Sequence, residues 1–287
     1  MSDSEPSRRR TSAPSGDLAT YQRESFEWDG RLHDVYRRGH GPAVIVITEI
    51  PGISPMVVGF ADRVVAMGCT AVLPDLFGVP GKDPMAKGKL GMITYTMSSL
   101  TKVCISREFT AFAAGKSSPI VSWLNALATK EHERCGGPGV GVVGMCLTGG
   151  FALAMATNRA VIAPVLSQPA LPFPVSKRHR RSIDSSDATI ASVADRCAAE
   201  GLQVLGLRFN GDPTVPADRF AMLRERLGDG FVAVELDQRD GNPTAPMSKH
   251  HSVLTVSLVD EPGEPTRRAL DAVLDLFRHK LLEEMTS

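Results

Sequence analysis

The fold is decided by the stretch VGVVGMCLTGGFALAMA at residues 140–156, where two different sequence patterns meet. A short β-branched run comes first, then a glycine-flanked cysteine, then a segment rich in alanine and other apolar residues. This order predicts a strand, a sharp turn and a helix. Only small flanking residues let a helix start so close to a strand, and the residue on such a turn projects above the sheet. Cys146 is therefore a candidate nucleophile.

The same turn places the backbone N–H of Leu147 at a predicted helix N-terminus. Unpaired amide donors and the positive end of the helix dipole favour a thiolate and a developing oxyanion at this position. One stretch can thus supply a nucleophile and half of an oxyanion hole. The alternative is that Cys146 is a buried structural thiol, because free cysteine is among the most buried residues.

The length of the chain and its balance of charged residues limit the classes of protein to which it can belong. The chain has 287 residues, and its 32 lysines and arginines equal its 32 aspartates and glutamates. This balance gives no electrostatic reason to expect nucleic acid or an anionic membrane as the main partner. The length fits one large α/β domain, which we prefer to two small ones because no linker interrupts the chain after its N-terminus.

The cysteines and the absence of long apolar runs indicate a cytoplasmic protein. No run of about eighteen apolar residues occurs, and the N-terminus lacks the apolar segment of a secretory signal. An odd number of scattered cysteines without a CxxC pair argues against a disulfide framework and against a zinc site. The five are Cys69, Cys104, Cys135, Cys146 and Cys197.

Residues 1–20 are polar and charged, with few large apolar side chains, so they cannot offset the entropy lost on ordering. We expect a disordered tail there and a single folded domain over residues 21–287. Residues 25–28 and 31–36 alternate apolar and polar residues around Asp29-Gly30, which predicts a hairpin.

Strand and helix patterns then alternate along the chain, which predicts an α/β fold with a mostly parallel central sheet and helices on both faces. Residues 76–119 carry a weaker pattern and are predicted as loop and short helices over the active face, and the basic cluster 177–181 is predicted as an exposed loop. Strands are predicted at 43–48, 70–75, 140–145, 160–166, 203–209 and 231–236, and helices at 54–69, 120–134, 188–199, 217–227 and 266–283.

Reactive groups in an open α/β sheet lie beyond the carboxyl ends of the strands. Glu49 ends the strand at 43–48, Asp212 follows the strand at 203–209, and His251 lies in the loop after the strand at 231–236. Each has a plainer alternative, since Gly-Asp-Pro is turn chemistry and a loop histidine is often a surface residue.

With Cys146 these residues give the order nucleophile, aspartate, histidine, which is the order of α/β-hydrolases. A free thiol is only slightly ionised at neutral pH, so His251 would accept its proton and return it to the leaving group. Asp212 would hold the imidazole in one tautomer and stabilise its cation.

The sequence resembles the dienelactone hydrolase family from about Phe26 to Leu282. The matching motifs are TEIPG at 48–52, AVLPDLF at 71–77, GMCLTG at 144–149, GDPTVP at 211–216 and HS at 251–252. The resemblance implies an α/β-hydrolase fold with Cys146 as the nucleophile and Asp212 and His251 completing the triad.

The resemblance also implies further roles. Glu49 would interact with the resting thiol and help to activate it when substrate binds. The backbone N–H groups of Ile50 and Leu147 would form the oxyanion hole.

The chain departs from the family pattern at several positions. Thr148 stands where the turn normally has glycine. The family's dienelactone enzymes carry an arginine shortly after the histidine to bind the substrate carboxylate, whereas residues 253–255 here are Val, Leu and Thr. Arg107 is a candidate anion contact, or an exposed helix arginine. His250 competes with His251 as the base, and we prefer His251 because His-Ser fits the motif.

The sequence therefore predicts a cysteine-dependent hydrolase of small esters or lactones that acts through an acyl-enzyme on Cys146, with no metal and no organic cofactor. The alternative is a non-enzymatic protein of the same fold that binds a small ligand or a partner. A serine hydrolase has little support, because no serine occupies a comparable turn. The sequence carries no signal of the oligomeric state.

Overall fold

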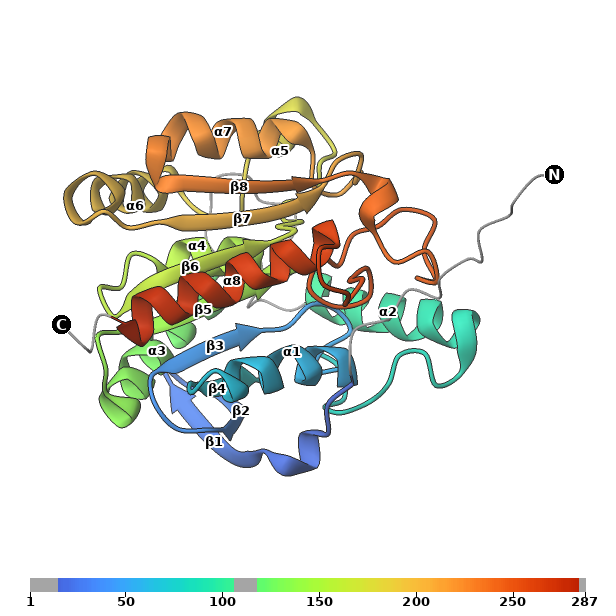
Figure 1. The fold of residues 1–287 in the computed structure, drawn as a ribbon, viewed down its shortest axis with the longest axis horizontal. Helices are drawn as coiled ribbons and strands as arrows, with labels where there is room; N and C mark the ends of the chain where they lie inside the picture. Colours follow the sequence, from blue (N-terminus) through green and yellow to red (C-terminus); the bar gives the residue numbers. More distant parts are fainter. Residues whose placement is uncertain (1–14, 106–117, 284–287) are drawn as a thin grey trace.

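The computed structural model describes residues 15–105 and 118–283 and contains one eight-stranded sheet (Figure 1). The strand order is β1-β2-β4-β3-β5-β6-β7-β8. The two hairpin strands β1 and β2 are antiparallel to each other, β2 is antiparallel to β4, and the remaining pairs are parallel. The strands are β1 (Gln22–Trp28), β2 (Arg31–Arg38), β3 (Ala43–Ile47), β4 (Thr70–Pro74), β5 (Val140–Met145), β6 (Val161–Ser167), β7 (Val204–Phe209) and β8 (Phe231–Leu236). The predicted hairpin and mostly parallel sheet are confirmed.

The centre of the sheet is built from strands that are buried along their whole length. Every residue of β3, β4 and β5 is buried, as expected for β-branched runs covered by helices on both faces. The register pairs Ile47 at the end of β3 with Gly144 near the end of β5. Glu49 and Cys146 therefore leave neighbouring strands at the same edge of the sheet.

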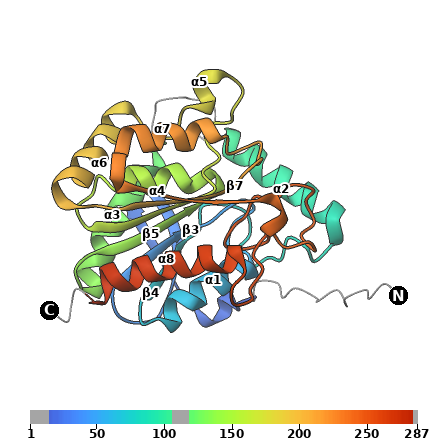
Figure 2. The same ribbon diagram turned by 45° about the horizontal axis from the view of Figure 1, so that its top comes forward.

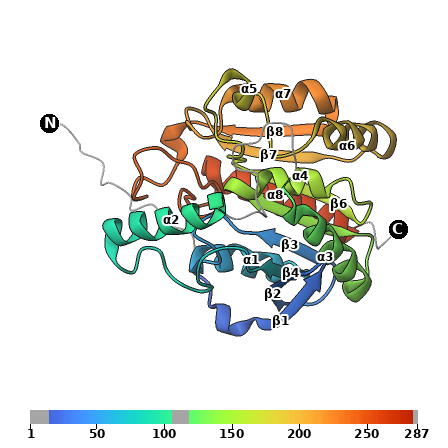
Figure 3. The same ribbon diagram turned by 180° about the vertical axis from the view of Figure 1, so that it is seen from behind.

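Two helical layers cover the sheet, one on each face (Figures 2 and 3). Helices α1 and α8 share one buried apolar cluster with one face of the sheet, and α3, α4, α6 and α7 share a second cluster with the other face. The helices are α1 (Pro55–Ala66), α2 (Gly88–Ile105), α3 (Ile120–Cys135), α4 (Gly149–Met155), α5 (Lys177–Arg180), α6 (Asp187–Glu200), α7 (Ala217–Leu227) and α8 (Pro265–Leu281).

The structure differs from the sequence predictions in three places. Residues 88–105 form the single 18-residue helix α2 instead of loop and short helices. It lies beyond the carboxyl ends of the strands (Figures 1 and 3), over the face that the prediction assigned to this segment. Residues 177–180 form the short helix α5, whose first turn is capped by the side chain of Ser176. Serine is a preferred N-cap residue, and this signal was overlooked in the basic cluster.

The third difference concerns the N-terminal segment. Residues 18–20, predicted to be part of a disordered tail, form a short 3-10 helix capped by Asp17. The N–H of Gly16 donates to the carbonyl of Pro55, which joins this segment to the start of α1. Residues 1–14 lie outside the described part of the chain. Among the described residues, no helix is both long enough and apolar enough to cross a membrane.

Candidate active site

Cys146 occupies the predicted sharp turn between β5 and α4. Its φ angle is 57°, a left-handed conformation that is rare for a residue with a side chain and that tertiary structure must enforce. The flanking glycines are required by close contacts: a Cβ on Gly144 would lie 2.1 Å from the carbonyl oxygen of Thr148, and one on Gly149 would lie 2.6 Å from Pro169. The small residues of the motif thus make the turn possible.

Thr148 replaces the usual glycine and gives its hydroxyl a specific role. The Oγ1 atom accepts a 2.8 Å hydrogen bond from the N–H of Met145 and lies 2.9 Å from the carbonyl oxygen of Ile47, to which it can donate. The residue is fully buried. The side chain therefore links the ends of β5 and β3 directly beneath the turn.

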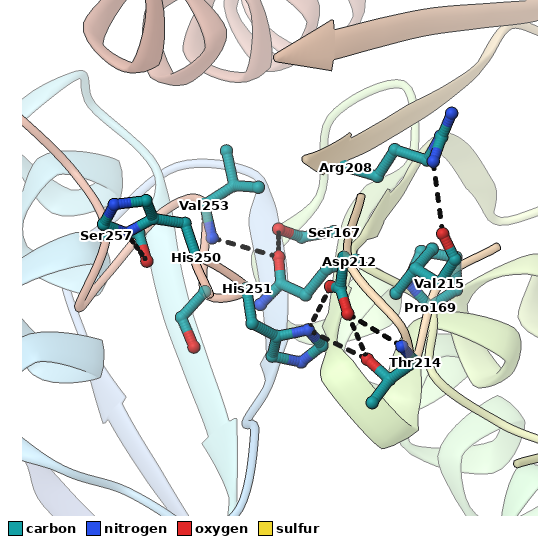
Figure 4. A network of polar contacts seen from close by, with 12 residues as sticks. Ser167, Pro169, Arg208, Asp212, Thr214, Val215, His250, His251, Val253 and Ser257 are labelled. Carbon is teal, nitrogen blue, oxygen red and sulfur yellow. Dashed lines mark hydrogen bonds and ion pairs between the residues drawn. The ribbon is translucent and has the colours of Figure 1, made fainter. Parts of the chain in front are cut away.

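Asp212 and His251 are brought together as the sequence predicted. His251 Nδ1 lies 2.5 Å from Asp212 Oδ2, and Thr214 donates to Asp212 Oδ1 through its backbone N–H at 2.8 Å and its hydroxyl at 2.7 Å (Figure 4). The carboxylate is almost fully buried at the end of β7. A carboxylate fixed by three donors orients the ring, so that Nδ1 carries a proton and Nε2 is free to act on another group.

Charges and hydrogen bonds within the site shift the pKa values of His251 and Asp212. Burial opposes the protonated imidazole, but the charge of Cys146, hydrogen bonds with Asp212 and Cys146, and the charge of Asp212 raise the pKa of His251 well above its ordinary value of 6.5. Burial also opposes ionisation of Asp212, yet hydrogen bonds from His251 and Thr214 and the imidazole charge hold its pKa below the ordinary value. This arrangement favours an imidazolium that faces the sulfur of Cys146.

His250 belongs to a different environment. Its Nδ1 lies 3.3 Å from the hydroxyl of Ser257, and its ring lies against Phe209 at an interplanar angle of 39°, with centroids 5.5 Å apart. Figure 4 shows the His250 ring near Ser257 and the His251 ring near Asp212 and Thr214. Of the two candidates for the base, His251 is therefore the one that contacts Asp212.

Glu49 lies at the carboxyl end of β3, buried in a network of neutral donors. Its carboxylate accepts hydrogen bonds from Ser252 at 2.7 Å, from Gln168 at 3.2 Å and from the hydroxyl of Thr255. Glu49 and Cys146 line the same cavity, and the expected contact of Glu49 with the resting thiol stays a prediction. Through its three donors, Glu49 ties the end of β3 to the loop that carries His251.

Two further residues hold the site together and were missed in the sequence. The fully buried amide of Gln168 accepts from the N–H of Val253 and donates to Glu49. Arg219 is fully buried and donates to backbone carbonyls of the loop after β6 and of Thr214. Burial lowers the pKa of Arg219 to about 10. Only their long-range contacts reveal these roles.

The two residues predicted to supply the oxyanion donors line the same cavity as Cys146. Ile50 and Leu147 both line a cavity of about 510 Å³ together with Cys146 and His251. Leu147 is the second residue of a 3-10 helix, where N–H groups have no intrahelical acceptor. Among the described residues, the N–H of Ile50 donates to no protein acceptor.

The structure does not test every sequence-predicted site. Arg107 lies outside the described residues. Within the described ranges 15–105 and 118–283, no group of three or more histidine, cysteine, aspartate or glutamate side chains could hold a metal ion.

A comparison with known proteins identifies the family to which the chain belongs. The model of the dienelactone hydrolase family matches residues 32–279. No curated protein sequence matches the chain.

Similar solved structures share the fold at low sequence identity. One is assigned as a dienelactone hydrolase from Klebsiella pneumoniae, with a TM-score of 0.56, 17% identity, and 90% of this chain and 97% of that chain covered. A dienelactone hydrolase-like promiscuous phosphotriesterase from metagenomic libraries has a TM-score of 0.54, 15% identity and coverage of 91% and 98%. A 2,6-dihydroxy-pseudo-oxynicotine hydrolase has a TM-score of 0.55, 18% identity and coverage of 93% and 70%. These likenesses show the α/β-hydrolase fold.

Proposed function

Because the chain belongs to the dienelactone hydrolase family, we propose that it is a cysteine-dependent hydrolase of small esters or lactones. The observation that carries this proposal is the position of Cys146. It stands at a strained turn on the floor of a cavity that the linked pair of His251 and Asp212 also lines. A nucleophile, a base and a group that orients the base are the three parts that acyl transfer by a thiol requires.

The proposed reaction has two halves. The Cys146 thiolate attacks the carbonyl carbon, and the tetrahedral intermediate collapses as the His251 imidazolium protonates the leaving alcohol. The thioester that remains is then attacked by water, whose proton passes to His251. Collapse of the second intermediate releases the acid and restores the thiolate and the imidazolium. Each step uses side chains and water, so the proposal requires no metal or organic cofactor.

The amides of Ile50 and Leu147 would stabilise the negative oxygen in both intermediates. A well-placed donor of this kind is worth about 3–4 kcal/mol of transition-state stabilisation. The Ile50 amide is free of protein acceptors among the described residues, which supports this assignment. Glu49, with its three donors, would keep the loop carrying Ile50 in register with the loop carrying His251.

The proposal is tested by substitution of the nucleophile. Cys146→Ala should lower the turnover of aryl esters and lactones by at least about 10⁴-fold compared with the wild type, while the circular dichroism spectrum stays unchanged. Cys146→Ser is the matched control, because it replaces the thiol by a less nucleophilic hydroxyl at the same turn and should retain only weak activity. Undiminished turnover by Cys146→Ala would rule the mechanism out.

A non-enzymatic ligand-binding protein is the alternative, and alkylation separates the two. Burial raises the pKa of Cys69 to about 11 and also raises the pKa of Cys135 and of Cys197. Cys146, beside an imidazolium, should therefore react with iodoacetamide much faster than these three thiols. Equal rates, read by peptide mass spectrometry, would favour the binding protein.

The proposal also covers the domain organisation and the cellular compartment of the enzyme. We take residues 21–287 as one domain, which fits a single sheet and one family match over residues 32–279. We also propose a reducing, cytoplasmic environment, since the thiol of Cys146 must stay reduced to act.

A further inference from the structure

The wall of the active-site cavity is built from methionine. The cavity of about 510 Å³ has Cys146 and His251 on its floor, and its size is that of a site for a small organic ligand. Methionine side chains are flexible and polarisable, and they adapt to apolar ligands of different shape. The methionines that line this cavity are Met56, Met85, Met92, Met97 and Met247.

The mouth of the cavity is apolar as well. Met97 on α2 is 55% exposed and Met247 in the loop before His251 is 50% exposed, although both side chains also line the cavity. Large exposed apolar side chains at the rim of a pocket are typical of surfaces that meet an apolar ligand. Two methionines that line the cavity are therefore also accessible from the surface.

The charges in the cavity disfavour an anionic substrate. Three carboxylates line it, those of Glu49, Asp83 and Asp212, whereas Lys249 is the one lysine among the described lining residues, which include no arginine. Lys249 is exposed to solvent, which screens its charge. Apart from the imidazole of His251, which is paired with Asp212, the described lining residues thus offer a substrate carboxylate no buried cationic partner in exchange for its lost hydration.

Residues 253–255, the positions at which the family's dienelactone enzymes carry an arginine, supply no cation to the cavity of this chain. Val253 and Leu254 are buried in the core, and the hydroxyl of Thr255 donates to Glu49. These side chains cannot bind a substrate carboxylate. The same positions that would supply a cation instead support the loop of His251.

We infer that this enzyme acts on neutral esters or lactones with a hydrophobic acyl group, which lies against the methionine wall formed by Met85, Met92 and Met97. This inference rests on the proposed function. The leaving oxygen must face His251, which comes from the loop after β8, whereas these methionines come from the segment between β4 and α3. We therefore assign the acyl group, which points away from the leaving oxygen, to the wall that comes from this other segment.

The first experiment varies the acyl chain at a constant leaving group. For p-nitrophenyl acetate, butyrate, hexanoate and octanoate, kcat/KM should rise by up to about fourfold for each added methylene, the equivalent of about 0.8 kcal/mol. A flat or falling series with turnover that still depends on Cys146 would overturn the inference alone. Absence of Cys146-dependent turnover for every ester would overturn the proposed function and this inference together.

The second experiment changes the charge of the substrate. The p-nitrophenyl hexanoate should be preferred at least tenfold over the mono-p-nitrophenyl ester of adipic acid, which has the same acyl chain with a terminal carboxylate. A preference for the adipate ester that Lys249→Gln removes would overturn the inference, because it would identify Lys249 as an anion site.

The third experiment changes the wall. Met92→Gln places a polar side chain of similar size in the cavity and should lower the ratio of kcat/KM for octanoate over acetate about tenfold. Met67→Gln is the matched control, because Met67 is the C-cap residue of α1 and packs in the core cluster instead of the cavity. It should leave the ratio unchanged. An unchanged ratio for Met92→Gln, or an equal fall in the control, would overturn the assignment of this wall.

Discussion

The floor and the wall of the active-site cavity are built by opposite means. On the floor, Asp212 is held by two donors from Thr214 in its own loop and by His251 from a distant loop, and Glu49 is held by three donors from other loops. On the wall, Met92 and Met97 of α2 offer apolar surface that is only partly buried. Under the proposed function, the difference means that the chain fixes the reacting groups by polar networks and leaves recognition of the substrate to adaptable packing.

The largest effect is expected when the carboxylate of Asp212 on the cavity floor is changed. Asp212→Asn should lower kcat by about 10²- to 10⁴-fold, because an amide can stabilise the wrong tautomer of His251 and does not stabilise its cation. Steady-state kinetics on an aryl ester measures the effect. Asp83→Asn is the control, since Asp83 lines the same cavity and its Oδ1 accepts from the N–H of Met85. Equal losses in both variants would contradict the role of Asp212.

A second test removes the buried hydrogen bonds that Arg219 donates to the loops around the site. Arg219→Met should lower the free energy of unfolding by about 3 kcal/mol or more, because several buried carbonyls would lose their donor at once. Arg219 donates to Ser182 at 2.5 Å, to Pro169 at 2.5 Å and to Pro172 at 2.6 Å. Urea denaturation measures the change, with the 89% exposed side chain in Arg239→Met as control. A loss below about 1 kcal/mol would show that these contacts are dispensable.

A third test follows the charge on His251 as pH changes. Folding raises the pKa of this imidazole despite its burial, with the charge of Cys146 as the largest raising cause. The stabilisation is therefore complete below pH 6.5, the ordinary pKa, and is lost as pH rises through the raised value. NMR titration of the ring should give a lower pKa in Cys146→Ala than in the wild type. The same pKa in both proteins would refute the coupling.

The smallest effect is expected on the wall. Met97→Ala should change the free energy of unfolding by no more than about 0.5 kcal/mol, because the side chain is 55% exposed and leaves no buried cavity when truncated. Thermal denaturation measures this change. A loss of more than about 2 kcal/mol would mean that the wall is as tightly built as the floor, and the contrast between the two regions would fail.

Local patterns were enough to predict the parts of the molecule that short-range geometry determines. The glycine before Cys146 predicts the turn because a Cβ at Gly144 would meet the backbone of Thr148, which belongs to the same strand-turn-helix unit. Asp212 and His251 were predicted from their positions after strand patterns, since parallel strands end at one edge. These inferences need only the period of the chain and the rules of the sheet.

Long-range contacts could not be predicted in the same way. Gln168 and Arg219 act through buried contacts with residues far away in the sequence, and no local pattern marks them. Helix α2 was missed because Gly91, Thr94 and Thr96 are weak helix formers. Arg107, the one predicted anion contact, lies outside the described residues and stays a prediction.

The hydroxyl of Thr148 has a consequence for how the two proposed oxyanion donors behave. Leu147 follows β5 and Ile50 follows β3, and Thr148 bonds to the ends of both strands. Thr148 therefore ties together the ends of the two strands that lead to these amides. A glycine at this position would lack both hydrogen bonds, so under the proposed function the threonine fixes the strand ends from which the two oxyanion donors extend.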